Sequence, residues 1–383
     1  MAKRNPTKTL AFLFFLLSSQ TLAETPSPPS NAAPAQTHHH HHHHPLRRIL
    51  LGVLFGSVTG ASLAALFALA VRTFLLVMNR TPILRGPVVF SPKINPKTLE
   101  SAVVASDRLE PLGGKYFKAV LDTGEPVAVK RLGPPGPQTR PDKRRAHRHL
   151  EMLARARHRN LMSLLAYHHA RDDGRFSLVY DYVPNGSLEE AMKRVRSGRL
   201  SLNWEARLRI AVGIVKGLQY LHFGCHPRVL HYGLKPANVL LDEEFEPMLA
   251  DCGVARLVSD SGGAAVGGFA YVAPECLQSC RYTDKSDVFS FGVILGVLLT
   301  GRDPLDPTFA TEGSGGSLAR WLRHLQQTGE AREALDKGML GEEVEEEEMM
   351  MAIRIAVICL SDLPADRPSS DELVAMLTQL HSF

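Results

Sequence analysis

An uncharged and mostly apolar run of 23 residues, Ile49–Val71, divides this chain into two very different parts. The apolar character resumes after Arg72 and continues to Met78. About 20 apolar residues are enough for a helix to cross a bilayer. A buried helix of a globular protein rarely has this length without a polar face. The sequence therefore predicts a single transmembrane helix over residues 49–78.

Residues 1–23 have the pattern of a secretory signal peptide. Basic residues precede a short apolar stretch, Leu10–Leu17, and Thr21–Ala23 supplies small residues for cleavage. This stretch is too short to span a bilayer, which favours cleavage over the alternative of a retained signal anchor. Cleavage would place the N-terminus outside the cell and the long C-terminal part in the cytoplasm, as expected for a single-pass protein of the plasma membrane. Retention in the endoplasmic reticulum without a partner is a separate expectation.

Residues 24–48 are predicted to form a short, disordered extracellular segment. They are rich in Pro, Ser and Ala, and include seven consecutive histidines, His38–His44. Such a composition cannot form a packed core. Natural low complexity is the favoured interpretation of the histidine run. An added tag or a Zn²⁺ or Cu²⁺ ligand remains an alternative, and no role is assigned.

Small residues recur every four positions in the predicted membrane helix. This spacing places them on one face of the helix, where small side chains let a second helix approach closely. Ordinary glycine and alanine content of a membrane helix is the alternative. The register favours a face for helix association, made of Gly52, Gly56, Gly60, Ala64 and Ala68.

Charge and cysteine content exclude several classes of function. The net charge of +5 is modest, so nucleic-acid binding is not indicated. All five cysteines follow the predicted span and none has a paired metal-site spacing, which favours a reduced cytosolic domain without zinc. A proline-containing juxtamembrane linker is expected over residues 79–105, and one domain over residues 106–383.

Six short motifs follow one another within that domain. They include the strand Val127–Lys130, the loop His231–Asn238, Asp251–Gly253, Ala273–Glu275, Asp287–Gly292 and Arg367–Pro368. In this order they resemble the motifs of protein kinases, and most closely those of plant receptor-like kinases. The resemblance covers about Ser106–His381. It implies an α+β, bilobal fold with a small β-rich lobe and a large helical lobe.

Several positions depart from the kinase pattern. Gly233 stands where the family has the catalytic Asp, and glycine cannot accept a proton. His149 stands where a helix should supply the Glu partner of Lys130, although a shift of that helix could bring Glu151 into its place. The phosphate-covering loop keeps only Gly114 of its glycines and contains Pro111, which lacks an N–H group.

Three residues that bind nucleotide and metal in the family are retained: Lys130, Asn238 and Asp251. Two interpretations remain open. These residues form a residual, weak ATP site in which Asn238 and Asp251 bind Mg²⁺, or they survive only because they stabilise the fold.

The combined losses favour a pseudokinase, because the base, the phosphate loop and the Lys–Glu pair serve different parts of catalysis. A receptor-like serine/threonine kinase of low activity is the alternative. The chain resembles the membrane-bound kinase-like proteins of CLAVATA signalling in plant meristems. That resemblance implies pairing with a leucine-rich-repeat receptor-like protein that lacks a kinase domain, reached here through the membrane helix. A CLE peptide would then be perceived indirectly, through that partner.

Overall fold

The structure of the 383-residue chain is a computed structural model. It describes residues 45–79, 87–92, 94–104, 110–113, 116–132, 143–169, 176–254, 268–311, 316–340 and 343–380. The chain divides into two compact units, Met1–Arg80 and Thr81–Phe383. The predicted signal peptide, the histidine run and Gly114 lie outside the described residues.

The first unit contains one long helix, α2 (Pro45–Asn79). Its segment Gly52–Thr73 has a mean hydropathy of 2.0, and its side chains are exposed. Twenty-two residues in a helix match the apolar thickness of a bilayer. The hydroxyls of Thr59 and Ser62 donate to backbone carbonyls one turn earlier, at 2.7 and 2.8 Å, which satisfies these polar groups inside the helix. The helix is consistent with the predicted membrane span.

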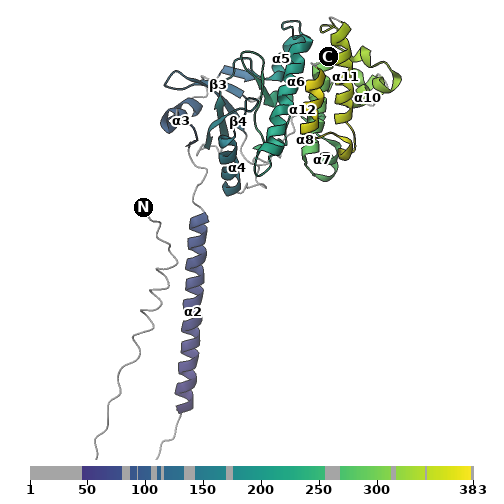
Figure 1. Ribbon diagram of the computed structural model, residues 1–383. Helices are drawn as coiled ribbons and strands as arrows, with labels where there is room; N and C mark the ends of the chain where they lie inside the picture. The colour runs from purple at the N-terminus through teal and green to yellow at the C-terminus, as the bar shows by residue number, and fades with distance from the viewer. Residues whose placement is uncertain are drawn as a thin grey trace, which may run out of the picture. The chain divides into compact units, whose positions relative to one another are not determined.

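The small lobe of the second unit is built on a six-stranded antiparallel sheet, with the order β1-β5-β6-β4-β3-β2 (Figure 1). The strands are β1 (Val88–Val89), β2 (Glu110–Gly113), β3 (Tyr116–Val120), β4 (Pro126–Leu132), β5 (Leu164–His169) and β6 (Phe176–Asp181). Strand residues alternate between the two faces of a sheet. Val127 and Val129 accordingly lie in one core cluster and Ala128 in the other, and the alternation puts Lys130 on the same face as Ala128.

A helix covers each face of this sheet. Helix α3 (Pro96–Val104) buries Leu99 and Val103 against the face with Val127 and Val129. Helix α4 (Lys143–Arg155) buries Leu150 in the cluster that contains Ala128. Both β1 and α3 belong to the segment 79–105 that was expected to be a linker. That segment therefore adds an edge strand and a covering helix to the lobe.

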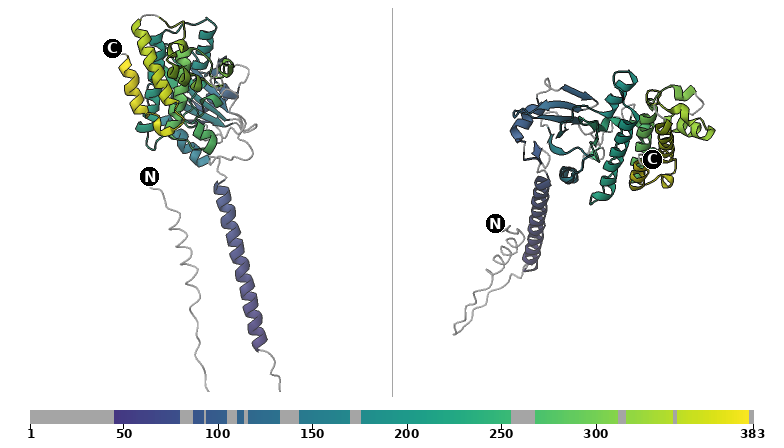
Figure 2. Two further views of the ribbon diagram at one scale, coloured as in Figure 1. Left: turned by 90° about the vertical axis from the view of Figure 1, so that its right-hand side faces the viewer. Right: turned by 45° about the horizontal axis from the view of Figure 1, so that its top comes forward.

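The large lobe is helical (Figure 2). Its helices are α5 (Leu188–Arg196), α6 (Trp204–Gln219), α7 (Pro274–Ser279), α8 (Asp284–Thr300), α9 (Thr308–Thr311), α10 (Leu318–Thr328), α11 (Glu343–Cys359) and α12 (Ser370–Gln379). A small hairpin, β7 (Val239–Leu241) and β8 (Pro247–Leu249), carries the segments that lead into the candidate site. The bilobal, kinase-like fold expected from the sequence is confirmed.

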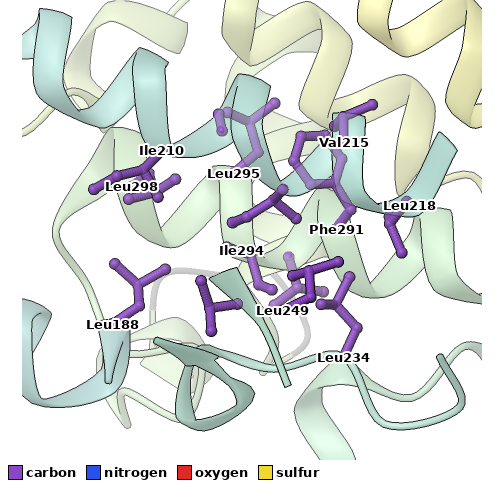
Figure 3. Close-up of a cluster of buried hydrophobic side chains, with 14 of the residues drawn as sticks. Leu188, Ile210, Val215, Leu218, Leu234, Leu249, Phe291, Ile294, Leu295 and Leu298 are labelled. Atoms are coloured by element: carbon purple, nitrogen blue, oxygen red, sulfur yellow. The ribbon is translucent and has the colours of Figure 1, made fainter. Parts of the chain in front are cut away.

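Helix α8 is the centre of the large lobe. A capping box between Thr283 and Ser286 starts the helix, and Gly301, at φ 67°, ends it. All residues of 286–300 are buried, as expected for a helix that is apolar on every side. Figure 3 shows how its side chains pack against those of α6 and the hairpin. The labelled residues are Leu188, Ile210, Val215, Leu218, Leu234, Leu249, Phe291, Ile294, Leu295 and Leu298.

Candidate functional site

Helix α8 anchors the loop that corresponds to the kinase catalytic loop, His231–Asn238, through hydrogen bonds. Asp287 accepts hydrogen bonds from the backbone N–H of His231, at 2.8 Å, and of Tyr232, at 3.0 Å. His222 donates to the same carboxylate at 3.0 Å. A bidentate Arg367–Glu275 ion pair, at 2.8 and 2.9 Å, fixes the neighbouring helix α7. The framework around the loop is therefore intact although its chemistry has changed.

Gly233 stands at the point of this loop where a catalytic base would be. Its carbonyl accepts a hydrogen bond from Asn238 Nδ2 at 2.8 Å, which links two residues of the same loop. The position offers no side-chain group to accept a proton from a substrate hydroxyl. General-base catalysis is worth about 10²–10⁴-fold in rate, and Gly233 cannot provide it.

The three retained residues come together from three distant parts of the chain. Lys130 lies on β4, Asn238 ends the short 3-10 turn Pro236–Asn238, and Asp251 follows β8. The Lys130 ammonium forms an ion pair with Asp251 Oδ2 and donates to Asn238 Oδ1 at 2.9 Å. All three are buried, with 6–7% of their surface exposed. The structure thus brings these predicted site residues into one closed polar cluster, and their role in binding stays a prediction.

Two tyrosines complete this cluster. Tyr116 faces Lys130 across the β3–β4 ladder, and its ring centroid lies 4.5 Å from the Lys130 ammonium. Tyr180, on β6, donates its hydroxyl to Asp251 Oδ1 at 3.1 Å. The two rings lie 6.4 Å apart in a tilted arrangement. Tyr116 and Tyr180 therefore fill the region beside the ion pair with aromatic side chains of the chain itself.

Both phenols are neutral at physiological pH, and burial strengthens this preference. It raises the pKa of Tyr116 well above its ordinary value, and the neighbouring Tyr180 and Cys252 raise it further. The pKa of Tyr180 is raised in the same way, by burial first and by Cys252 second. Neutral hydroxyls can donate hydrogen bonds, which is the role of Tyr180 toward Asp251. Tyr116 stands where the kinase pattern of the phosphate-covering loop has a valine, and this difference is the sequence signal for the aromatic packing.

His149 lies over the Asp251–Gly253 segment. Its Nε2 donates to the Cys252 carbonyl at 3.1 Å. A Cβ built on Gly253, which has φ +72°, would meet that nitrogen at 2.5 Å, so the helix and the segment approach closely because residue 253 is glycine. Glu151 pairs with Arg155 at 2.6 Å. The helix position therefore does not bring Glu151 to Lys130, whose carboxylate partner is Asp251.

His231 and Cys252 are two buried titratable residues next to the cluster, and both are uncharged. Burial lowers the pKa of His231 to about 4, with Asp287 acting in the opposite direction. Neither ring nitrogen of His231 has a hydrogen-bond partner among the described residues, and the ring is neutral at physiological pH. Burial raises the pKa of the Cys252 thiol, which therefore stays protonated. A cysteine at this position fills less space than the phenylalanine typical of kinases.

Metal binding would have to use oxygens that already have partners. Mg²⁺ prefers oxygen ligands and near-octahedral geometry. The oxygens of Asn238 and Asp251 have the right chemistry, but Lys130 occupies Asn238 Oδ1 and Asp251 Oδ2, and Tyr180 occupies Asp251 Oδ1. No group of three or more His, Cys, Asp or Glu residues within the described ranges is arranged to hold a metal. The residue types fit Mg²⁺, whereas their arrangement does not.

The second predicted site is the small-residue face of α2. A Cβ added at Gly52, Gly56 or Gly60 would meet no atom within 4 Å, and Ala64 and Ala68 are exposed. Nothing within the helix itself therefore fills the shallow face that these residues form. Its role in pairing with another helix remains a prediction.

Comparison with known proteins identifies the larger unit. A family model described as the protein kinase domain matches residues 112–377. The inactive leucine-rich repeat receptor-like protein kinase CORYNE of Arabidopsis thaliana is 62% identical over 322 residues, which cover 82% of this chain and 79% of that protein. The leucine-rich repeat receptor-like kinase SOBIR1 of the same plant is 36% identical over 77% of this chain. The chain spans only 49% of SOBIR1.

Solved structures agree with this identification. The pseudokinase domain of BIR2, an immune regulator of the RLK/Pelle family, superposes with a TM-score of 0.62 at 30% identity, covering 80% of this chain and 93% of that one. The kinase domain of maize SIRK1 bound to AMP-PNP gives a TM-score of 0.64 at 25% identity, covering 77% and 99%. The similar structures thus include both a pseudokinase and a nucleotide-bound kinase.

Proposed function

The chain belongs to the protein kinase family, and on that premise we propose that it is a membrane-anchored pseudokinase that acts as a signalling scaffold. One observation carries the proposal. Lys130 and Asp251 form an ion pair with each other and also contact Asn238, Tyr116 and Tyr180. The groups that a kinase uses to bind phosphate and Mg²⁺ therefore already have partners within the chain. The residue opposite them, Gly233, supplies no base.

The energetics of the cluster support this proposal. Removing one partner of a buried ion pair costs about 3–5 kcal/mol, because the other charge stays buried without compensation. A nucleotide would have to separate Lys130 from Asp251 and displace the Tyr116 ring before either charged group could serve it. Part of its interaction energy would offset that reorganisation. Nucleotide binding is therefore weak or absent, and the cluster holds the two lobes together without a ligand.

Partnership in the membrane is the second part of the proposal. CORYNE is named as an inactive leucine-rich repeat receptor-like kinase, and the chain covers most of that relative's length. We infer a leucine-rich-repeat receptor-like partner that lacks its own kinase domain and pairs through Gly52, Gly56, Gly60, Ala64 and Ala68. Such a partner would perceive a CLE peptide, and this chain would transmit the signal from the plasma membrane, with its N-terminus outside. Without the partner it would be retained in the endoplasmic reticulum.

A low-activity receptor-like kinase is the second candidate. The intact framework favours it, because Asp287 holds the loop backbone and Arg367 pairs with Glu275. A similar SIRK1 kinase domain binds AMP-PNP. Loss of a base alone need not abolish phosphoryl transfer, which depends mostly on positioning and charge stabilisation.

Phosphotransfer by residues 81–383 separates the two candidates. The purified unit is incubated with labelled ATP, Mg²⁺ or Mn²⁺ and generic protein substrates, next to a Lys130→Ala control. We expect no incorporation above the control. We also expect Gly233→Asp alone to restore little, since Lys130 still pairs with Asp251. Reproducible incorporation that disappears in Lys130→Ala would establish the low-activity kinase instead.

A further inference from the structure

The most basic part of the chain is the short segment 143–159. It contains seven Lys or Arg residues and one acidic residue, Glu151, a net charge of +6. The whole chain has a net charge of only +5, so the net positive charge of this segment exceeds that of the entire protein. Helix α4 makes up most of it. Neither the nucleotide site nor the membrane helix accounts for such a concentration of charge.

The basic side chains lie opposite the buried face of α4. Leu150 and Leu153 are buried against the sheet, as their place in the small-lobe core requires. Arg148 and Arg155, seven residues apart and therefore two turns apart on one face, are both exposed. Arg155 is 78% exposed. Figure 1 shows α4 beside the sheet of the small lobe.

Two further arginines follow the helix. Arg157 donates to the Ala154 carbonyl at 2.6 Å, which fixes its position at the helix end. Arg159 is 74% exposed, and its carboxylate neighbour, Glu246, is 4.0 Å away. We call Arg148, Arg155, Arg157 and Arg159 the basic surface of α4. All four arginines are exposed, and Glu151 is the only acidic residue in the sequence of segment 143–159.

A membrane surface is the partner that fits this surface best. Clusters of basic residues near a membrane span are attracted to the anionic lipids of the cytoplasmic leaflet. Arginine also hydrogen-bonds phosphate groups in a bidentate manner. Only residues 80–87 connect the end of α2 to β1, and a chain of that length spans at most about 30 Å. β1, the first strand after this tether, pairs with β5, and α4 packs on the same strand β5.

We propose that the basic surface of α4 docks on anionic phospholipid headgroups of the membrane that α2 crosses. The inference rests on the proposed orientation, with the kinase-like unit on the cytoplasmic side. Docking fixes the lobe relative to the membrane without a protein partner. Helix α4 lacks the catalytic Glu of the family in this chain. Docking gives its exposed side a separate role.

Vesicle co-flotation of residues 81–383 tests the proposal. This unit has its own cores, and the similar solved structures are isolated domains, so it folds without α2. The test variant is Arg148→Gln/Arg155→Gln/Arg159→Gln, since glutamine keeps the helix propensity. The matched control, Arg194→Gln/Arg199→Gln/Arg354→Gln, removes the same charge from exposed positions on the large lobe. Melting temperatures establish that both variants are folded.

The parent unit is expected to float with vesicles that contain about 30% phosphatidylserine and not with pure phosphatidylcholine. Each basic residue contributes about fivefold to such binding, so the α4 variant should bind more than about tenfold less tightly. The large-lobe control should bind as the parent does. Raising the salt concentration should release the parent and this control from the vesicles. Absence of phosphatidylserine-dependent flotation, or equal loss in both variants, would overturn the proposal. Binding of polyglutamate but not of vesicles, lost in the α4 variant, would replace the membrane with an acidic protein partner.

Discussion

Lys130 and Asp251 form an ion pair in which each side chain is only 7% exposed. In a kinase these two residues serve the nucleotide from opposite sides, the lysine through phosphate and the aspartate through Mg²⁺. Here each is the other's counter-ion, and Tyr116 and Tyr180 shield the pair from water. Under the proposed function, the cluster serves as an internal connection between the small and the large lobe.

Removal of one charge from this pair is expected to destabilise the fold. Lys130→Met leaves the Asp251 carboxylate buried beside Tyr180, and the free energy of unfolding should fall by about 3 kcal/mol. The double variant Lys130→Met/Asp251→Leu removes both charges and should be more stable than Lys130→Met. Urea unfolding of residues 81–383 measures both. A Lys130→Met protein as stable as the parent would contradict the structural role of the pair.

Nucleotide binding should depend on Tyr116. The parent is expected to show little rise in melting temperature at about 1 mM ATP with Mg²⁺, because stabilisation follows the ratio of ligand concentration to Kd. Tyr116→Val restores the smaller residue of the kinase pattern and frees the space over Lys130, so ATP should raise its melting temperature further. That rise should fall again when Asp251→Asn is added.

The matched control for this experiment is Tyr282→Val. Tyr282 packs against Tyr232 at a ring distance of 5.4 Å, outside the Lys130 cluster. Its removal should leave the response to ATP unchanged. A large ATP response of the parent, equal to that of Tyr116→Val, would mean that the tyrosine does not obstruct the site.

The sequence predicted the framework of the site much better than its contents. Motif order was enough to predict the bilobal fold and the convergence of Lys130, Asn238 and Asp251, because these positions are fixed by the backbone of the family. The packing of Tyr116 on Lys130 depends on the β3–β4 register and on side-chain directions, which a motif does not contain. Sequence reasoning therefore recognised the loss of kinase groups without recognising what replaced them.

Two other features of the structure were not predicted from the sequence, for different physical reasons. The segment 79–105 has several prolines and reads as a linker, yet the two-residue strand β1 and the short helix α3 are stabilised by tertiary packing on the sheet. Such short elements have little intrinsic stability and leave a weak pattern in the sequence. The basic surface of α4 was not recognised because the net charge of the whole chain is small and gives no sign of a local concentration of positive charge.

Acid should destabilise the unit through His231. Burial holds the folded-state pKa of His231 at about 4, below the value near 6.5 of an unfolded histidine. The unfolded chain therefore binds a proton first as the pH falls. The stability that the neutral ring provides is complete above about pH 6.5 and is lost progressively toward pH 4, by about 3 kcal/mol in all.

His231→Phe tests this dependence, because phenylalanine fills the buried space without a titrating group. Urea unfolding between pH 7 and pH 4 should show a smaller loss of stability for this variant than for the parent. His226→Phe is the control, since His226 is an exposed histidine in a loop of the same lobe. Identical pH profiles of the parent and His231→Phe would mean that other groups cause the acid sensitivity.

Pairing with the receptor-like partner should depend on the small-residue face of α2. Gly56→Leu places a bulky side chain in open space on that face, where it would keep a second helix from close contact. Association in co-precipitation and delivery to the plasma membrane should therefore fall, while the kinase-like unit stays folded. Leu54→Ala, on another face of α2, should have little effect. If Gly56→Leu pairs and traffics as the parent does, and deletion of residues 81–383 abolishes pairing, the kinase-like unit is the pairing module and the glycine face is incidental.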